Sequence, residues 1–182
     1  MVVWISGYSS YEIVGVITLL SDSGVVVRYL QKGDRVCSGD ALILCLSSEP
    51  LLGWYRYLKI VRWIAERYDA QIIVLCPEVV YQSGVIRGRN IVVVNGKSGL
   101  AQLTRVLTQS VQHCFPKGNK EDYQKDMWSV FLKRISETLL ISPSSDSDIT
   151  RMRKAYSQRS SMLQHLGFTS LLKLKVFIAG KS

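Results

Sequence analysis

This 182-residue sequence lacks the spacing of a metal-binding motif. Its cysteines are scattered and include no Cys-x-x-Cys pair: Cys37, Cys45, Cys76 and Cys114. Its two histidines, His113 and His165, are far apart in the chain. A structural zinc site needs four nitrogen or sulfur ligands at short spacings, so we expect no metal. Free cysteine in an apolar run behaves as a small hydrophobic residue, which favours a reduced, cytoplasmic protein.

Long apolar runs are also missing. No segment approaches the roughly 18–20 unbroken apolar residues that span a bilayer, so we expect no membrane association. The first residues, MVVWISGYSSYE, have neither the basic start nor the cleavage site of a signal peptide, and instead predict a strand.

Acidic residues are scarce at one end of the chain. The net charge is +9, and residues 1–110 contribute +3 of it whereas residues 111–182 contribute +6. After Asp148 there are seven cations and no acid. A basic C-terminal part on a nearly balanced front half indicates a polyanionic partner.

The front half alternates short apolar runs with amphipathic segments. The apolar runs predict strands at 2–5, 25–30, 40–46, 71–75 and 91–94, and the 3.6-residue spacing predicts helices at 11–20, 51–68 and 100–111. Strands that are apolar throughout are typical of a parallel sheet covered on both faces. We therefore expect an α/β domain over residues 1–112 with five parallel strands.

Ligand sites in such sheets lie at the carboxyl ends of the strands. The residues expected there are Ser6, Gly7, Cys45, Ser47, Cys76 and Lys97. With one cation and no carboxylate, this set is poorly suited to a divalent metal, and we expect no cofactor.

The order and spacing of these elements resemble the receiver domain of bacterial response regulators over about residues 1–112. DALILCLSSEP resembles that family's third strand and would place the phosphate-accepting aspartate at Cys45. SGYSSYEIVG occupies the place of the family's acidic pair, where this chain has Ser6 and Gly7. VLCP places Cys76 at the family's Thr/Ser switch position, and NGKS matches the family's lysine with Lys97. The resemblance implies a pseudo-receiver that keeps the fold and lacks the phosphorylation chemistry.

Two other interpretations of the front half remain open. The Ser- and Gly-rich turn at 6–10, before a helix, could cradle the phosphate of a flavin, as in flavodoxin-like proteins. Cys45 and Cys76 could form a redox pair, although only Lys97 is available to lower a thiol pKa. A simple turn and apolar packing are the plainer explanations.

The composition changes at 113–126, HCFPKGNKEDYQKD, which we take as an interdomain linker. Apolar spacing returns in a helix from Met127 to about residue 140, in a second helix ending at Leu166-Gly167, and in a last one after Thr169 or Ser170, either of which can cap it. Residues 127–182 are therefore predicted to form a small all-α domain compatible with a helix-turn-helix module.

The middle helix carries the basic charge. RMRKAYSQRSSMLQHLG holds four cations and no acid, and places one apolar stripe opposite a face rich in hydroxyl, amide and basic groups. These side-chain types bind phosphates and base edges, although a solvated helix face has the same pattern. The residues predicted to contact DNA are Arg151, Arg153, Lys154, Gln158, Arg159, Ser160, Ser161 and Lys173.

The back half resembles the LuxR/FixJ-type DNA-binding domain over about residues 128–180. ISETLLISP is similar to that family's second helix and turn, and SQRSSMLQHLGFTSLLKLKVFI to its recognition helix, Leu-Gly stop and last helix. The interval between Pro143 and Leu166 is longer than in the family, and the family's Pro-x-Glu-rich first helix is not visible.

A chain that combines these two resemblances is similar to auxiliary regulators of the enteric capsule-synthesis (Rcs) type. They imply a bacterial transcription regulator, not an enzyme, that binds double-stranded DNA and works as a homodimer or as a heterodimer with another LuxR-type regulator. The last helix and the helix at 100–111 are candidate dimer surfaces. The alternatives are an adaptor that pairs with a DNA-competent regulator without binding DNA itself and, more weakly, a flavin-binding flavodoxin-like enzyme.

Overall fold

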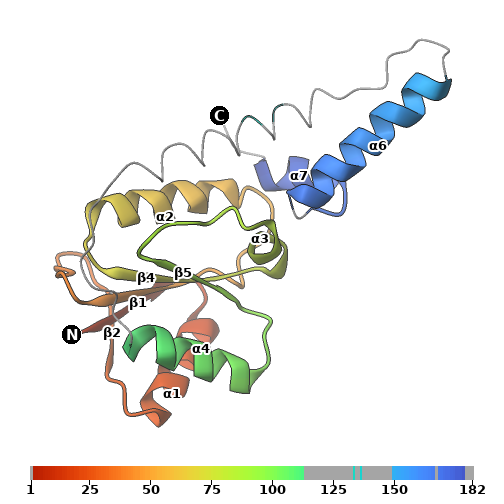
Figure 1. Ribbon diagram of the computed structural model, residues 1–182. Coiled ribbons are helices and arrows are strands. Elements are labelled where there is room, and N and C mark those ends of the chain that lie inside the picture. The colour runs from red at the N-terminus through yellow and green to blue at the C-terminus, as the bar shows by residue number, and fades with distance from the viewer. Residues whose placement is uncertain (1, 113–132, 134–135, 137–148, 167, 179–182) are drawn as a thin grey trace.

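The computed structural model describes residues 2–112, 133, 136, 149–166 and 168–178 (Figure 1). Five strands form one parallel sheet in the order β2-β1-β3-β4-β5. They are β1 (Val3–Gly7), β2 (Val27–Tyr29), β3 (Ala41–Cys45), β4 (Gln71–Cys76) and β5 (Ile91–Asn95). This is the strand order of flavodoxin-like folds, so the predicted parallel α/β domain is confirmed.

Helices cover both faces of the sheet (Figure 1). On one face lie α2 (Tyr55–Arg67) and α3 (Glu78–Ser83), and on the other lie α1 (Ser10–Asp22) and α4 (Leu100–Gln112). Helices α1, α2 and α4 each bury an apolar stripe, which is why spacing in the sequence was sufficient to locate these three of the four.

Side chains of the central strands alternate between two cores. Leu42 and Ile72 belong to the core under α2 and α3, whereas Ile43 and Ile73 belong to the core under α1 and α4. Because both faces of the sheet are buried, β3 and β4 are apolar or enclosed at every position, which explains the unbroken runs in the sequence.

Three elements differ most from the prediction. The helix predicted from residue 51 begins at Tyr55, because Gly53 adopts a positive φ of 69° and ends the preceding turn before the helix can start. The short helix α3 was not predicted, and β2 has three residues instead of six.

Two C-terminal helices follow, α6 (Ile149–His165) and α7 (Leu171–Ile178). The predicted cap of the last helix is present, because the Ser170 hydroxyl accepts the backbone N–H of Lys173 at 3.2 Å. The predicted linker 113–126 and helix 127–140 lie outside the described residues, apart from Lys133 and Ser136. The domain boundaries and the helix-turn-helix arrangement therefore stay predictions.

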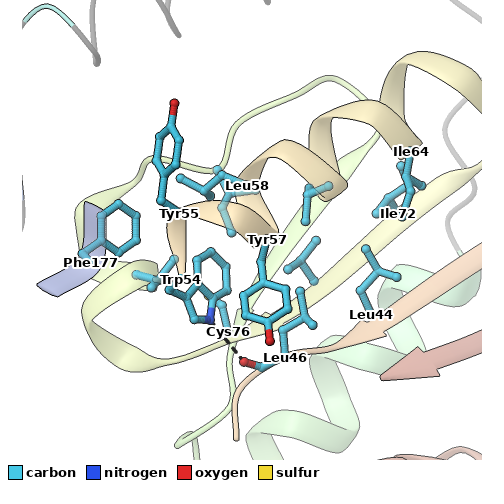
Figure 2. Close-up of a cluster of buried hydrophobic side chains, with 14 of the residues drawn as sticks. Leu44, Leu46, Trp54, Tyr55, Tyr57, Leu58, Ile64, Ile72, Cys76 and Phe177 are labelled. Carbon is cyan, nitrogen blue, oxygen red and sulfur yellow. Dashed lines mark hydrogen bonds between the residues drawn. The ribbon is translucent and has the colours of Figure 1, made fainter. Parts of the chain in front are cut away.

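The end of α7 packs against the start of α2 (Figure 2). Phe177 is fully buried and stacks on Trp54, with ring centroids 6.3 Å apart and planes 18° apart. The Phe168 ring lies 5.2 Å from Phe177, and the Gly53 backbone N–H donates to the carbonyl of Val176 at 3.0 Å. The C-terminal helices thus share a hydrophobic core with one face of the sheet domain.

Candidate functional site

The residues predicted for the receiver-like site gather at the carboxyl edge of the sheet. Gly7 pairs with Cys45 at the ends of β1 and β3, and Cys76 ends β4 opposite Asn95 of β5. Ser6 precedes Gly7 in β1. Lys97 follows β5 in an exposed turn, where its backbone N–H donates to the Asn95 side chain at 3.0 Å. The strands therefore place four of the five residues together, with Lys97 at the rim.

Neither thiol at this edge is accessible. Cys45 and Cys76 are fully buried, and the Cys76 thiol points to the Val94 carbonyl at 3.7 Å. Burial, and secondarily the negative charge of Glu12, raises the pKa of Cys76 to about 12 and that of Cys45 further still. A thiol that stays protonated is a poor nucleophile, so these two cysteines act as packing residues here.

A carboxylate that the sequence analysis did not single out lies at the centre of this edge. One oxygen of Glu12 accepts the Ser47 backbone N–H at 3.0 Å and the Ser47 hydroxyl at 2.7 Å, and the other accepts the Ser48 backbone N–H at 3.2 Å. Three donors from the loop after β3 therefore bind a negative charge supplied by α1. Such charge-assisted hydrogen bonds are among the stronger ones in proteins.

The position of Glu12 follows from the start of α1. Ser9 caps this helix, because its side chain accepts the Glu12 backbone N–H at 3.4 Å. The spacing Ser9-x-x-Glu12 is that of a capping box, in which the glutamate would reach back to the cap residue. In this chain the carboxylate reaches across to the β3 loop instead. The capping pattern was the available signal in the sequence, but it pointed to a different partner.

Two glycines allow neighbouring segments to approach closely at this edge. A Cβ at Gly7 would come within 2.6 Å of the Cys45 carbonyl oxygen, and one at Gly96 within 2.0 Å of the Ser47 Cβ. The ends of β1 and β3 therefore touch directly, as do the loops after β3 and β5, and a side chain at either glycine would push its neighbour away. Within the described chain, no cluster of three His, Cys, Asp or Glu side chains could hold a metal ion.

The predicted DNA-binding residues lie mostly on exposed surface of α6. Lys154, Gln158 and Ser161 are exposed at i, i+4 and i+7 and share one side of the helix. Arg153 and Ser160 are also exposed, seven residues apart on the neighbouring strip. The structure thus assembles a continuous polar surface from five of the predicted residues.

Two other predicted contacts, Arg159 and Lys173, lie elsewhere. Arg159 is half-buried, with its guanidinium carbon 4.8 Å from the centroid of the Tyr156 ring, a cation–π arrangement. Lys173 is exposed on α7. Arg151 lies in α6, and its side chain is outside the described part of the structure. Arg159 and Lys173 are therefore set apart from the Lys154 side of α6.

The structure thus presents a sheet edge at which Glu12 binds the donors of the β3 loop, and a basic helix with an exposed polar side. Among the described helices, none is long and apolar enough to cross a membrane. Comparisons with protein-family models, with curated proteins and with solved structures find no match to this chain.

Proposed function

We propose that this chain is a DNA-binding transcription regulator and that α6 carries the DNA contacts. The observation that supports it is the exposed side of α6, a 17-residue helix with four cations and no acid. Lysine and arginine bind phosphates through counterion release, whereas glutamine and serine can hydrogen-bond to base edges in the major groove. A helix of this length presents both kinds of group along one groove.

The proposed regulator does not depend on phosphorylation. Cys45 occupies the strand end where the receiver resemblance would require an aspartate, and it is buried and protonated. The carboxylate of Glu12 already binds the nearby donors of Ser47 and Ser48. An incoming phosphoryl group would meet a fixed negative charge there, and the Ser47 and Ser48 donors are already bound to it, so control by protein pairing or another signal fits better.

Binding to DNA fragments from the host's own promoters would test the proposal. We expect the full chain to select a small number of fragments. Gln158→Ala should reduce that selectivity by about five- to 150-fold, the equivalent of about 1–3 kcal/mol for one lost base contact. Gln102→Ala is the matched control, because Gln102 is an exposed glutamine on α4, outside the helix that carries the proposed contacts. Equal, unselective binding by all three proteins would contradict the proposal.

An adaptor that pairs with a DNA-competent regulator is the second candidate. It is favoured by Arg159, whose guanidinium stacks on Tyr156 on the half-buried side of α6 and so leaves fewer cations for DNA. In that case the purified chain would bind none of the fragments and would bind them only together with its partner.

The flavin-binding alternative has less support. The phosphate of a flavin would have to approach the start of α1, where the Glu12 carboxylate already occupies the donors of the β3 loop. A yellow purified protein with flavin absorbance would restore this alternative.

A further inference from the structure

The outer side of α1 is uncharged where a surface helix normally carries charge. Tyr11 and Val14 are 91% and 62% exposed, and Gly15 and Thr18 continue the same side at i+4 and i+7 from Tyr11. These four residues, which we call the α1 surface, include no charged side chain. Amphipathic helices on a protein surface usually turn charged or polar residues to solvent, so the α1 surface has the composition of a contact surface.

Gly15 has no role inside the described chain. A Cβ added there would meet nothing within 4 Å. Glycine in the middle of a helix costs about 1 kcal/mol relative to alanine, so this position reduces helix stability without relieving any contact in the described structure. Glycine on an outer helix face does allow another backbone to approach closely.

The charge distribution indicates what could approach. α1 and α4 together contain only three charged residues, Glu12, Asp22 and Arg105, and Glu12 is hydrogen-bonded within the sheet edge. By contrast, α2 and α6 each carry four cations. Two copies of a chain with net charge +9 repel each other over most of their surfaces, and the α1–α4 side is where that repulsion is weakest.

The two remaining charges on this side are complementary. Asp22 and Arg105 are both exposed and of opposite sign, and within the described chain neither forms an ion pair. The two helices are adjacent, since the Thr108 hydroxyl of α4 donates to the Ser23 hydroxyl at 3.2 Å. A two-fold axis beside α1 would present the acid of one copy to the base of the other, twice in the same interface.

We propose that the α1 surface is a homodimer interface, in which α1 of one copy crosses α1 of a second copy at Gly15. Two-fold dimers are the commonest assemblies of soluble oligomers, and their interfaces must be self-complementary. The α1 surface meets that requirement with a small residue at its centre, apolar side chains around it and opposite charges nearby. This inference does not rest on DNA binding, and it differs from a dimer formed through the last helix.

Sedimentation equilibrium of the full chain without DNA, over a wide concentration range, tests the proposal. We expect a reversible shift from 20.5 kDa to twice that mass. Val14→Glu should raise the dimer dissociation constant at least about tenfold, because it places like charges across the axis. Leu172→Glu, at an exposed position on α7, is the control and should leave the constant unchanged.

Gly15→Ala distinguishes an effect on dimer association from an effect on the stability of the fold. It should raise the thermal stability of the dilute monomer, since the added methyl group meets nothing and improves helix propensity, and yet weaken association. Asp22→Arg and Arg105→Asp should each weaken the dimer, and the double variant should recover part of the loss. A monomer at every concentration, or a dimer that Leu172→Glu disrupts and Val14→Glu does not, would overturn the proposal.

Discussion

At the scale of single residues, Glu12 joins two parts of the chain that are distant in sequence. Its carboxylate accepts hydrogen bonds from Ser47 and Ser48, 35 and 36 residues away. The same charge contributes to the raised pKa of Cys45 and Cys76. One carboxylate thus fixes the loop after β3 and helps to keep the neighbouring thiols protonated.

Glu12→Ala should destabilise the fold by about 2–3 kcal/mol, because it leaves the loop donors without an acceptor. Urea unfolding monitored by tryptophan fluorescence would measure this change. Glu66→Ala is the comparison, since Glu66 forms an exposed ion pair with Arg62 at 2.7 Å, and such pairs contribute only about 0.5 kcal/mol. Equal effects of the two substitutions would show that the loop contacts of Glu12 are weak.

Asp40 has a comparable role at the opposite edge of the sheet. It is buried and accepts the backbone N–H of Val2 at 2.8 Å, the indole N–H of Trp4 at 3.1 Å and the backbone N–H of Cys37 at 3.0 Å. Burial alone would raise the pKa of Asp40, but these donors outweigh it and hold the pKa below the usual 3.8. The ionised form is therefore the one that stabilises the fold.

Because of Asp40, the free energy of unfolding should decrease at acidic pH. Its contribution is fully present above pH 3.8, the usual pKa, and is lost as the pH falls through the lower pKa of the folded state. Asp40→Asn should cost about 1–3 kcal/mol at neutral pH, and the difference from the parent should shrink in strong acid. Asp34→Asn, at an exposed loop position, should change the free energy of unfolding at neutral pH by no more than about 0.5 kcal/mol.

Gln71 provides the opposite case. It is buried at the start of β4, and among the residues that the structure describes, neither polar atom of its side chain has a hydrogen-bond partner. Because an unsatisfied buried amide costs about 1–3 kcal/mol, Gln71→Met should raise the free energy of unfolding by about that amount. Gln164→Met, at an exposed position, should stay within about 0.5 kcal/mol of the parent. A destabilised Gln71→Met protein would mean that the amide has a partner in solution.

At the scale of helices and strands, the sequence predicted what local periodicity encodes. β3 and β4 are apolar runs, and α1, α2 and α4 have helical spacing, so all five could be located. The helix α3 was missed because six residues are too few to establish a helical period.

The candidate site was predictable only in part. The strand ends could be aligned from the sequence, but the contact of Glu12 with Ser47 depends on where two loops meet in space. For α7, the spacing indicated that one side would be buried but not which surface would cover it. Contacts between distant segments are set by packing, which local spacing does not record.

The contact of α7 with α2 should make the C-terminal helices and the sheet domain unfold together. Phe177 is fully buried between Trp54 and Phe168, and removing a buried phenylalanine ring costs about 3–5 kcal/mol. Phe177→Ala should therefore lower the midpoint of the whole urea transition and change the fluorescence of Trp54. Leu172→Ala, at a position 70% exposed on the same helix, should do neither. A separate early transition in the parent would contradict shared packing.

At the scale of the whole molecule, basic charge is concentrated on two helices with different surroundings. The outer side of α2 carries Arg56 and Lys59, whose cationic groups lie 4.8 Å and 5.4 Å from the ring centroids of Tyr57 and Tyr55. On α6, Arg153 and Lys154 are exposed next to glutamine and serine. If α6 is the DNA-binding helix, its cations and not those of α2 should set the salt dependence of binding.

Paired substitutions can separate these two helices. For each phosphate that the protein neutralises, the slope of log affinity against log salt is steeper by about 0.9. Arg153→Gln with Lys154→Gln should therefore flatten the slope by about 1.8 and weaken binding on every DNA sequence, because phosphate contacts carry no base information. Arg56→Gln with Lys59→Gln removes the same charge from α2 and should leave the slope nearly unchanged. Equal flattening by both pairs would mean that DNA senses only the net charge of the chain, and the assignment of the contacts to α6 would then be wrong.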